Sequence, residues 1–92
     1  MYKLKFAKRT DKQIKIVKKN SKLYQRLLEI LKDISIDPYS PAFKFERLKH
    51  DKSGKMSKRL TDKDRVFYRV VEDKIYIQEV DILSILDHYS DN

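Results

Sequence analysis

The chain has 92 residues, one glycine, two prolines and no cysteine, which fits a single domain over residues 1–92 with one modest core. The lack of cysteine excludes disulfides and thiolate metal sites. The two histidines are far apart in sequence and make a weak case for zinc, so no cofactor is expected. No apolar run approaches the roughly 20 residues of a membrane span, and the first residues lack a signal-peptide apolar segment. A cytoplasmic protein without membrane association is expected.

The net charge of +8 is unevenly distributed. Residues 1–34 contain eleven basic and three acidic residues, whereas residues 35–92 contain eleven of each. A basic surface of this kind favours an acidic partner, of which nucleic acid is the first to consider. A Lys-rich surface also serves solubility, so charge alone leaves both explanations open.

The N-terminal part predicts a strand and two helices. Residues 2–7 alternate between apolar and polar side chains, which favours a short strand. Thr10 and Asp11 can cap a first helix that runs to about Asn20. Residues 21–34 predict a second helix, because one apolar face recurs at helical spacing, formed by Leu23, Tyr24, Leu27, Leu28, Leu31 and Ile34.

After Pro38, which disfavours helix in the residue before it, the pattern predicts consecutive strands. The expected strands include Phe43, Phe45 and Leu48 in the first, then residues 56–61, 65–72 and 75–83. In the third, Val66, Tyr68 and Val70 share one face, opposite Arg65, Phe67, Arg69 and Val71. Helices segregated from strands imply an α+β fold, with the N-terminal strand and two helices packed on an antiparallel sheet of four to five strands. The helices should cover one sheet face and leave the other open.

Four residues in or after these strands could serve RNA cleavage without a metal: Glu46, Arg59, Arg65 and His88. Such a reaction needs one group to take the proton of the ribose 2′-hydroxyl and another to protonate the departing 5′-oxygen. It also needs cations to stabilise the charge that builds on phosphorus. Taken singly, each residue is better explained as an ordinary surface charge or a solvated histidine, and the sequence alone does not bring them together.

Several segments follow the order of a known family: residues 37–39 (DPY), 46–50 (ERLKH), 53–54 (SG), 57–60 (SKRL), 64–68 (DRVFY) and 88–89 (HY). Together they resemble the YoeB (Txe) branch of the RelE/ParE toxin superfamily, the toxins of type II toxin–antitoxin systems. The resemblance covers over half of the chain. It implies a RelE-like fold, similar to microbial ribonucleases, and an endoribonuclease that cuts mRNA in the ribosomal A site and so inhibits translation.

The resemblance also implies residue roles. Glu46 would be the general base, His88 the general acid, and Arg65 the catalytic cation that holds the scissile phosphate. Lys49, Arg59 and Tyr89 would bind substrate, Tyr89 by stacking on a base or positioning the RNA. Cleavage would leave a 2′,3′-cyclic phosphate and a 5′-hydroxyl, with no metal.

The implied partners are the ribosome with its mRNA and a cognate acidic, partly disordered antitoxin that folds on binding. Operator DNA would be bound indirectly, mainly through the antitoxin, and family members can form homodimers. The Lys-rich N-terminal helices would contact ribosomal RNA phosphates.

The sequence departs from the family pattern at two informative places. Lys55 and Met56 stand where aromatic residues are usual, which predicts weaker stacking near the site. His88 follows Arg65 by 23 residues, a longer spacing than is typical, and a bulge or an extra turn near Ser84 could absorb the difference. His50 is interpreted as structural or solvent-exposed, with an RNA contact as the minority alternative.

Two other functions remain open. A non-catalytic basic RNA-binding module would explain the charge and the aromatic residues Phe43, Phe45, Phe67 and Tyr68. It would not explain the family order of Glu46, Arg65 and the terminal His-Tyr pair. An interaction protein whose basic surface binds an acidic protein partner is the second alternative.

Overall fold

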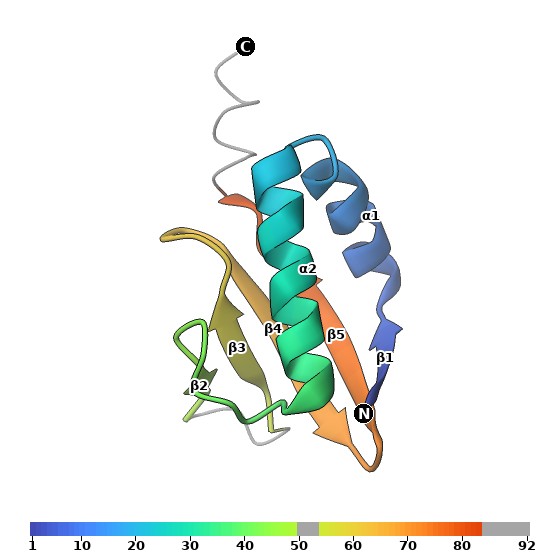
Figure 1. Ribbon diagram of the computed structural model, residues 1–92. Coiled ribbons are helices and arrows are strands. Elements are labelled where there is room, and N and C mark those ends of the chain that lie inside the picture. The colour runs from blue at the N-terminus through green and yellow to red at the C-terminus, as the bar shows by residue number, and fades with distance from the viewer. Residues whose placement is uncertain (50–53, 84–92) are drawn as a thin grey trace.

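The computed structural model describes residues 1–49 and 54–83. His50, Ser84, His88 and Tyr89 lie outside these residues. The elements follow the predicted order of one strand, two helices and a run of strands: β1 (Lys3–Phe6), α1 (Lys8–Val17), α2 (Ser21–Ile36), β2 (Glu46–Arg47), β3 (Met56–Arg59), β4 (Arg65–Val71) and β5 (Lys74–Val80) (Figure 1). Neither of these two helices has the length and apolar character needed to cross a membrane.

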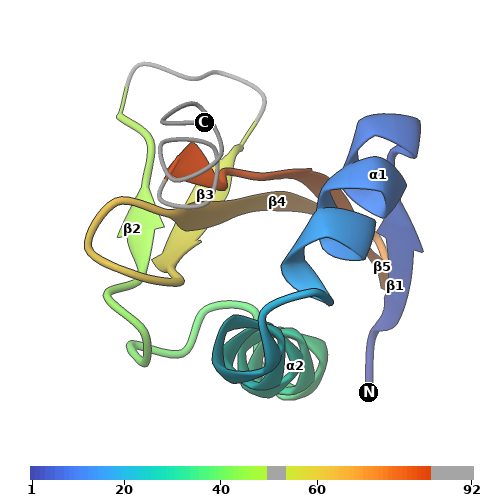
Figure 2. The same ribbon diagram turned by 90° about the horizontal axis from the view of Figure 1, so that it is seen from above.

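The strands form one five-stranded sheet in the order β1-β5-β4-β3-β2 (Figure 2). Strands β2 to β5 pair as an antiparallel meander, while β1 pairs with β5 in parallel. The predicted α+β class is therefore confirmed, but the sheet is mixed rather than wholly antiparallel. The chain leaves β1 through two helices before it re-enters the sheet, so no tight turn forces β1 to be antiparallel to its neighbour.

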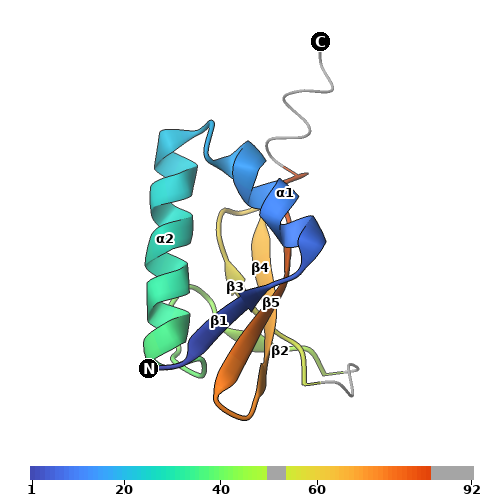
Figure 3. The same cartoon turned by 90° about the vertical axis from the view of Figure 1, so that its right-hand side faces the viewer.

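Helix α2 covers one face of the sheet (Figure 3). Leu23, Leu27, Ile30 and Ile34 recur at the spacing of one helical face and are buried against the sheet. The predicted break before this helix is confirmed, because the Asn20 side chain caps it by accepting a hydrogen bond from the Leu23 backbone N–H at 3.1 Å. The predicted apolar face was partly wrong, since Leu28 is exposed and the omitted Ile30 is fully buried.

Helix α1 begins earlier than predicted and without a side-chain cap at Ala7. Thr10 does not cap it; its Oγ1 donates instead to the Ile77 carbonyl at 3.0 Å, across to β5. Three residues further on, Gln13 Oε1 accepts a hydrogen bond from the Val80 N–H at 2.7 Å. Because β1 pairs with residues Lys74 to Ile77 of β5, the Gln13 contact satisfies a backbone group of β5, the Val80 N–H, beyond the end of β1.

The predicted strand around Phe43 and Phe45 was wrong. Phe43 and Lys44 have φ values of 57° and 54°, in the left-handed region that a strand does not use. The chain turns there, and β2 contains only Glu46 and Arg47. Phe43 and Phe45, whose spacing suggested a strand, lie in a loop instead and pack against the margin of the core.

Two buried side chains hold this loop between α2 and β2. The Tyr68 hydroxyl donates to the Pro38 carbonyl at 2.6 Å. Lys58 is fully buried, with its Nζ 3.1 Å from Asp33 Oδ2 on α2 and donating to the carbonyls of Ser40 at 2.8 Å and Ala42 at 2.7 Å. These contacts fix the path of the chain just before β2, and so the position of Glu46.

The two faces of the sheet have different surroundings, as the alternation in β4 predicts. Val66 and Tyr68 are fully buried on the side of α2, while Arg65, Phe67 and Arg69 on the opposite side are partly exposed. Among the described residues, no helix lies over β2, β3 and β4 on that opposite side (Figure 2). We call it the open face.

Candidate active site

Glu46 and Arg65 meet on the open face. Arg65 Nη1 donates to Glu46 Oε2 at 3.2 Å. Their backbones lie on β2 and β4, with β3 between them: Glu46 is paired with Ser57, and Arg65 with Arg59. Directly paired residues of neighbouring strands point to the same side of a sheet. The meander therefore brings together two of the predicted catalytic residues and the predicted substrate-binding Arg59.

Arginine side chains from β3 and β4 accompany the Glu46 carboxylate. Arg65 contacts the Glu46 carboxylate, and Arg59, paired with Arg65 in the strand register, adds a second guanidinium on the same side of the sheet. The Arg59 Nε atom is buried and has no hydrogen-bond partner among the described residues. An unsatisfied guanidinium N–H next to an ion pair is suited to an anionic ligand, because phosphate oxygens accept paired hydrogen bonds from arginine.

Lys49 lies just beyond β2 and is exposed. Together with Glu46 it lines a hollow of about 690 Å³. The hollow is formed by five consecutive residues: Phe45, Glu46, Arg47, Leu48 and Lys49. The carboxylate and the predicted supporting cation thus border one concave surface. This is the arrangement expected if an extended polyanion passes from Arg65 along β2.

Two further residues in this region were not assigned by the sequence. Ser57 stands between Glu46 and Phe67 in the strand register, and its Oγ is buried with no hydrogen-bond partner in residues 1–49 and 54–83. Phe67 shares the open face with Arg65, as the alternation predicted, but no role in the site was predicted for it. The alternation of β4 was the available signal, since it separates Phe67 from the core residue Tyr68.

An acidic group borders the site just after β5. The Asp81 N–H donates to the Arg65 carbonyl at 2.7 Å. Burial raises the pKa of the Asp81 carboxyl above its ordinary value, and the neighbouring negative charges of Asp64 and Glu79 raise it further. Hydrogen bonds from the backbone of Leu83 and Ile82 act in the opposite direction.

His88 and Tyr89 lie outside the described residues, so their predicted roles stay predictions, as does the predicted bulge near Ser84. A different bulge is present. Phe67 pairs with Glu79, and Tyr68 pairs with Ile77, which leaves Gln78 as an extra residue in β5. It lies beside the site and turns Glu79 toward the open face.

The fold is that of small bacterial toxins. A YoeB dimer structure from Staphylococcus aureus superposes with a TM-score of 0.78 and 24% identity, covering 88% of this chain and 95% of that chain. A structure described as a YoeB/ParE toxin from Agrobacterium tumefaciens gives the same TM-score at 18% identity, over 87% of this chain and 96% of that one. At these identities, the comparison establishes the fold alone.

Sequence comparison establishes the family. Residues 6–89 match the family described as the YoeB-like toxin of bacterial type II toxin–antitoxin systems. Toxin YoeB of Escherichia coli O6:H1 is 34% identical over 58 residues, which span 63% of this chain and 69% of that protein. Toxin YoeB of Escherichia coli K12 is 33% identical over the same lengths. The chain therefore belongs to the YoeB-like toxins, as its motifs predicted.

Proposed function

We propose that this toxin is a ribosome-dependent endoribonuclease that cuts mRNA in the A site and thereby inhibits translation. The observation that carries the proposal is the contact between the Glu46 carboxylate and the Arg65 guanidinium on the open face, with Arg59 opposite Arg65. Membership of the YoeB-like family supports it. The proposal uses the ribose 2′-hydroxyl as nucleophile and requires no metal ion.

Glu46 acts as the general base in this scheme. Its side chain is half exposed, so a ribose can reach it, and its Oε2 already accepts a hydrogen bond from Arg65. When RNA binds, Arg65 turns to the phosphate and the 2′-hydroxyl takes its place at the carboxylate. Glu46 then removes the hydroxyl proton as the 2′-oxygen attacks phosphorus.

Arg65 stabilises the negative charge that develops on the phosphate oxygens. Its partner in the strand register, Arg59, contributes a second cation from the same side of the sheet. Two guanidinium groups held by neighbouring strands need little rearrangement during the reaction, which is the condition for strong electrostatic stabilisation of a transition state. Lys49 holds the RNA backbone at the edge of the hollow beside β2.

His88 is the proposed general acid and Tyr89 the proposed residue that stacks on or positions the substrate; both follow from the family motif. The acid gives its proton to the 5′-oxygen as the bond from that oxygen to phosphorus breaks. The 2′-oxygen has by then bonded to the same phosphorus, so the products are a 2′,3′-cyclic phosphate and a 5′-hydroxyl end. The ribosome holds the message in the reactive orientation, which a protein of this size supplies poorly alone.

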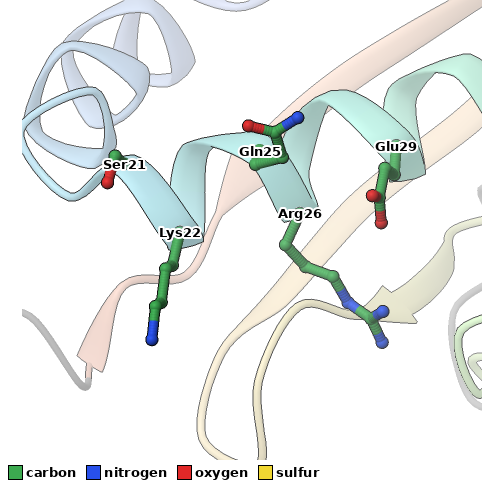
Figure 4. A pocket seen from close by; sticks show the side chains of 5 residues that line it. All are labelled: Ser21, Lys22, Gln25, Arg26 and Glu29. Atoms are coloured by element: carbon green, nitrogen blue, oxygen red, sulfur yellow. The ribbon is translucent and has the colours of Figure 1, made fainter.

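The basic helices are the proposed contact with ribosomal RNA. Lys12, Lys15 and other lysines of α1 are exposed. On α2, Lys22 and Arg26 border a hollow of about 320 Å³ and extend to the same side of the helix, as Figure 4 shows. Exposed cations on two successive helices contact phosphates without reading sequence. Their contribution should weaken as salt concentration rises.

The proposed partners are a cognate acidic antitoxin, partly disordered before it binds, and operator DNA held through that antitoxin. Structures from Staphylococcus aureus with this fold are described as a YoeB–YefM complex and as a YoeB dimer. A homodimer is therefore also proposed for this chain. The proposed location is the cytoplasm, where ribosomes and messages are found.

The test is cleavage of a defined mRNA on programmed ribosomes by the native chain and by Glu46→Ala, Arg65→Ala and His88→Ala. Glu72→Ala and Lys3→Ala serve as controls, because both side chains are exposed and lie outside the site and outside the two basic helices. The native protein and the controls should cut in the A site, and the three site variants should lose most of the rate. If only His88→Ala still cuts, the acid lies elsewhere.

A native chain that binds ribosomes but never cuts would support the alternative, a non-catalytic basic RNA-binding module. Tight antitoxin binding without any ribosome association would instead point to a protein-interaction role.

A further inference from the structure

Phe67 occupies a central place on the open face. In the strand register it pairs with Ser57 on one side and Glu79 on the other, and Ser57 pairs in turn with Glu46. Arg65 precedes Phe67 by two residues on the same strand, a separation of about 7 Å along one face. The ring therefore lies next to the proposed phosphate-binding arginine and in the same row as the proposed base.

Core packing among the described residues does not account for Phe67. The buried core and the half-buried apolar side chains packed against it do not include this residue. Its neighbours Val66 and Tyr68 are fully buried on the side of α2, whereas Phe67 keeps part of its surface exposed. An aromatic ring among arginines and lysines on a sheet face is suited to bind a ligand that is both flat and anionic.

The surroundings of the ring supply the complementary groups. Lys55 Nζ lies 4.9 Å from the ring centroid, so one face of the ring is turned toward a flexible cation rather than into the core. That arrangement suits a nucleotide, whose base stacks on an aromatic face while its phosphate attracts the lysine. Ser57 Oγ, buried without a hydrogen-bond partner in the described part of the chain, can bond to a polar group of a ligand seated between Glu46 and Phe67.

We propose that Phe67 forms a stacking subsite for a nucleobase of the bound RNA, beside the Glu46–Arg65 pair and flanked by Lys55 and Ser57. This inference rests on the proposed function, because it takes RNA as the ligand. Phe67 is a positioning residue: it fixes the nucleotide whose phosphate Arg65 holds, and it takes no part in proton transfer. Stacking accepts any base, so the subsite adds affinity and orientation rather than strict sequence preference.

The first test compares Phe67→Leu and Phe67→Tyr with the native chain in single-turnover cleavage on programmed ribosomes. In Phe67→Leu, the loss of one base–aromatic stack should raise the toxin concentration needed for the half-maximal cleavage rate by about 5- to 150-fold. Phe67→Tyr should stay close to native. The pH profile should be unchanged, since neither the base nor the acid is altered. Tyr76→Leu is the matched control, because Tyr76 is another exposed aromatic residue of the sheet, on β5.

The second test reads stacking without cleavage. A message with a 2′-deoxyribose at the scissile nucleotide and 2-aminopurine as the neighbouring base is bound to ribosomes. The native toxin and Phe67→Tyr should quench its fluorescence more than Phe67→Leu does. Because the message cannot be cut, this readout remains valid even if the native protein proves to have no nuclease activity.

Equal half-saturation and equal quenching for native and Phe67→Leu would overturn the subsite and leave the proposed nuclease standing. A native chain that quenches but never cuts would retain the subsite and overturn the nuclease. If Phe67→Leu instead loses thermal stability, Phe67→Met, which keeps a large apolar side chain without a ring, replaces it. Native behaviour of a folded Phe67→Met would likewise overturn the inference.

Discussion

Glu46 Oε2 and Arg65 Nη1 lie 3.2 Å apart, although 19 residues separate them in the sequence. The contact depends on the register of three strands. Glu46 is opposite Ser57 and Arg65 is opposite Arg59, so the two side chains meet across β3. A shift of either pairing by one residue would turn one of the two side chains to the other face of the sheet.

The first prediction separates activity from stability at this pair. The side chains of Arg65 and Glu46 are 35% and 50% exposed, so solvent screens their attraction. Glu46→Ala should therefore change the free energy of unfolding by less than about 1 kcal/mol, while it lowers the cleavage rate by roughly 10²- to 10⁴-fold. Urea unfolding and ribosome cleavage on one preparation measure both. A variant that loses several kcal/mol would instead make Glu46 a structural residue.

The second prediction concerns Lys58, which is fully buried against Asp33 and two loop carbonyls. Lys58→Ala should lower the free energy of unfolding by about 3 kcal/mol or more, because it leaves Asp33 and the carbonyls without their buried cation. Lys12→Ala, which removes an exposed lysine of α1, should cost little. Denaturant titration of both variants provides the measurement, and equal costs would contradict the prediction.

The third prediction concerns the Tyr68 hydroxyl, which donates to the Pro38 carbonyl from a buried position. Tyr68→Phe should cost about 0.5–1.5 kcal/mol at pH 7. Burial, together with the nearby charges of Asp33 and Asp37, raises the pKa of the Tyr68 hydroxyl. Above about pH 10, the unfolded chain releases this proton and the folded protein keeps it, so the native protein's advantage over Tyr68→Phe should shrink. Paired unfolding curves between pH 7 and 11 test this; a growing advantage would refute it.

The fourth prediction concerns Asp81, whose pKa is raised first by burial and then by Asp64 and Glu79. A raised carboxyl pKa means that folding favours the protonated form, so this group's contribution to stability falls as the pH rises through its folded pKa. Asp81→Asn should therefore stabilise the protein at pH 7, by less than about 1 kcal/mol given the solvent exposure. This gain in stability should vanish at pH values below those at which carboxyl groups ordinarily titrate.

Thermal unfolding of Asp81→Asn at pH 7 and pH 3 provides the measurement. Asp62→Asn is the control, because Asp62 lies exposed in the turn after β3. A stability loss for Asp81→Asn at pH 7 would contradict the prediction. It would mean that the backbone hydrogen bonds to the carboxylate stabilise the fold by more than the burial of its charge destabilises it.

Local patterns predicted the elements that bury one clear face. The alternation in β4 assigned Val66 and Tyr68 to the core and Phe67 to the opposite side, as found. Where tertiary contacts compete with local signals, the predictions failed. Thr10 has the chemistry of a helix cap but donates to β5, and Phe43 follows a strand-like spacing but lies in a left-handed turn.

The sequence by itself determined the α+β class, the family and the residue types needed for RNA cleavage, because periodicity, charge and motif order are local properties of the chain. Only the tertiary structure decided that β1 is parallel to β5, that Lys58 is a buried anchor and that Glu46 meets Arg65. These features depend on strand register and on which backbone groups remain to be satisfied after the chain folds. The residues next to the site in the sequence specify neither the register nor these partners, because both depend on segments far away along the chain.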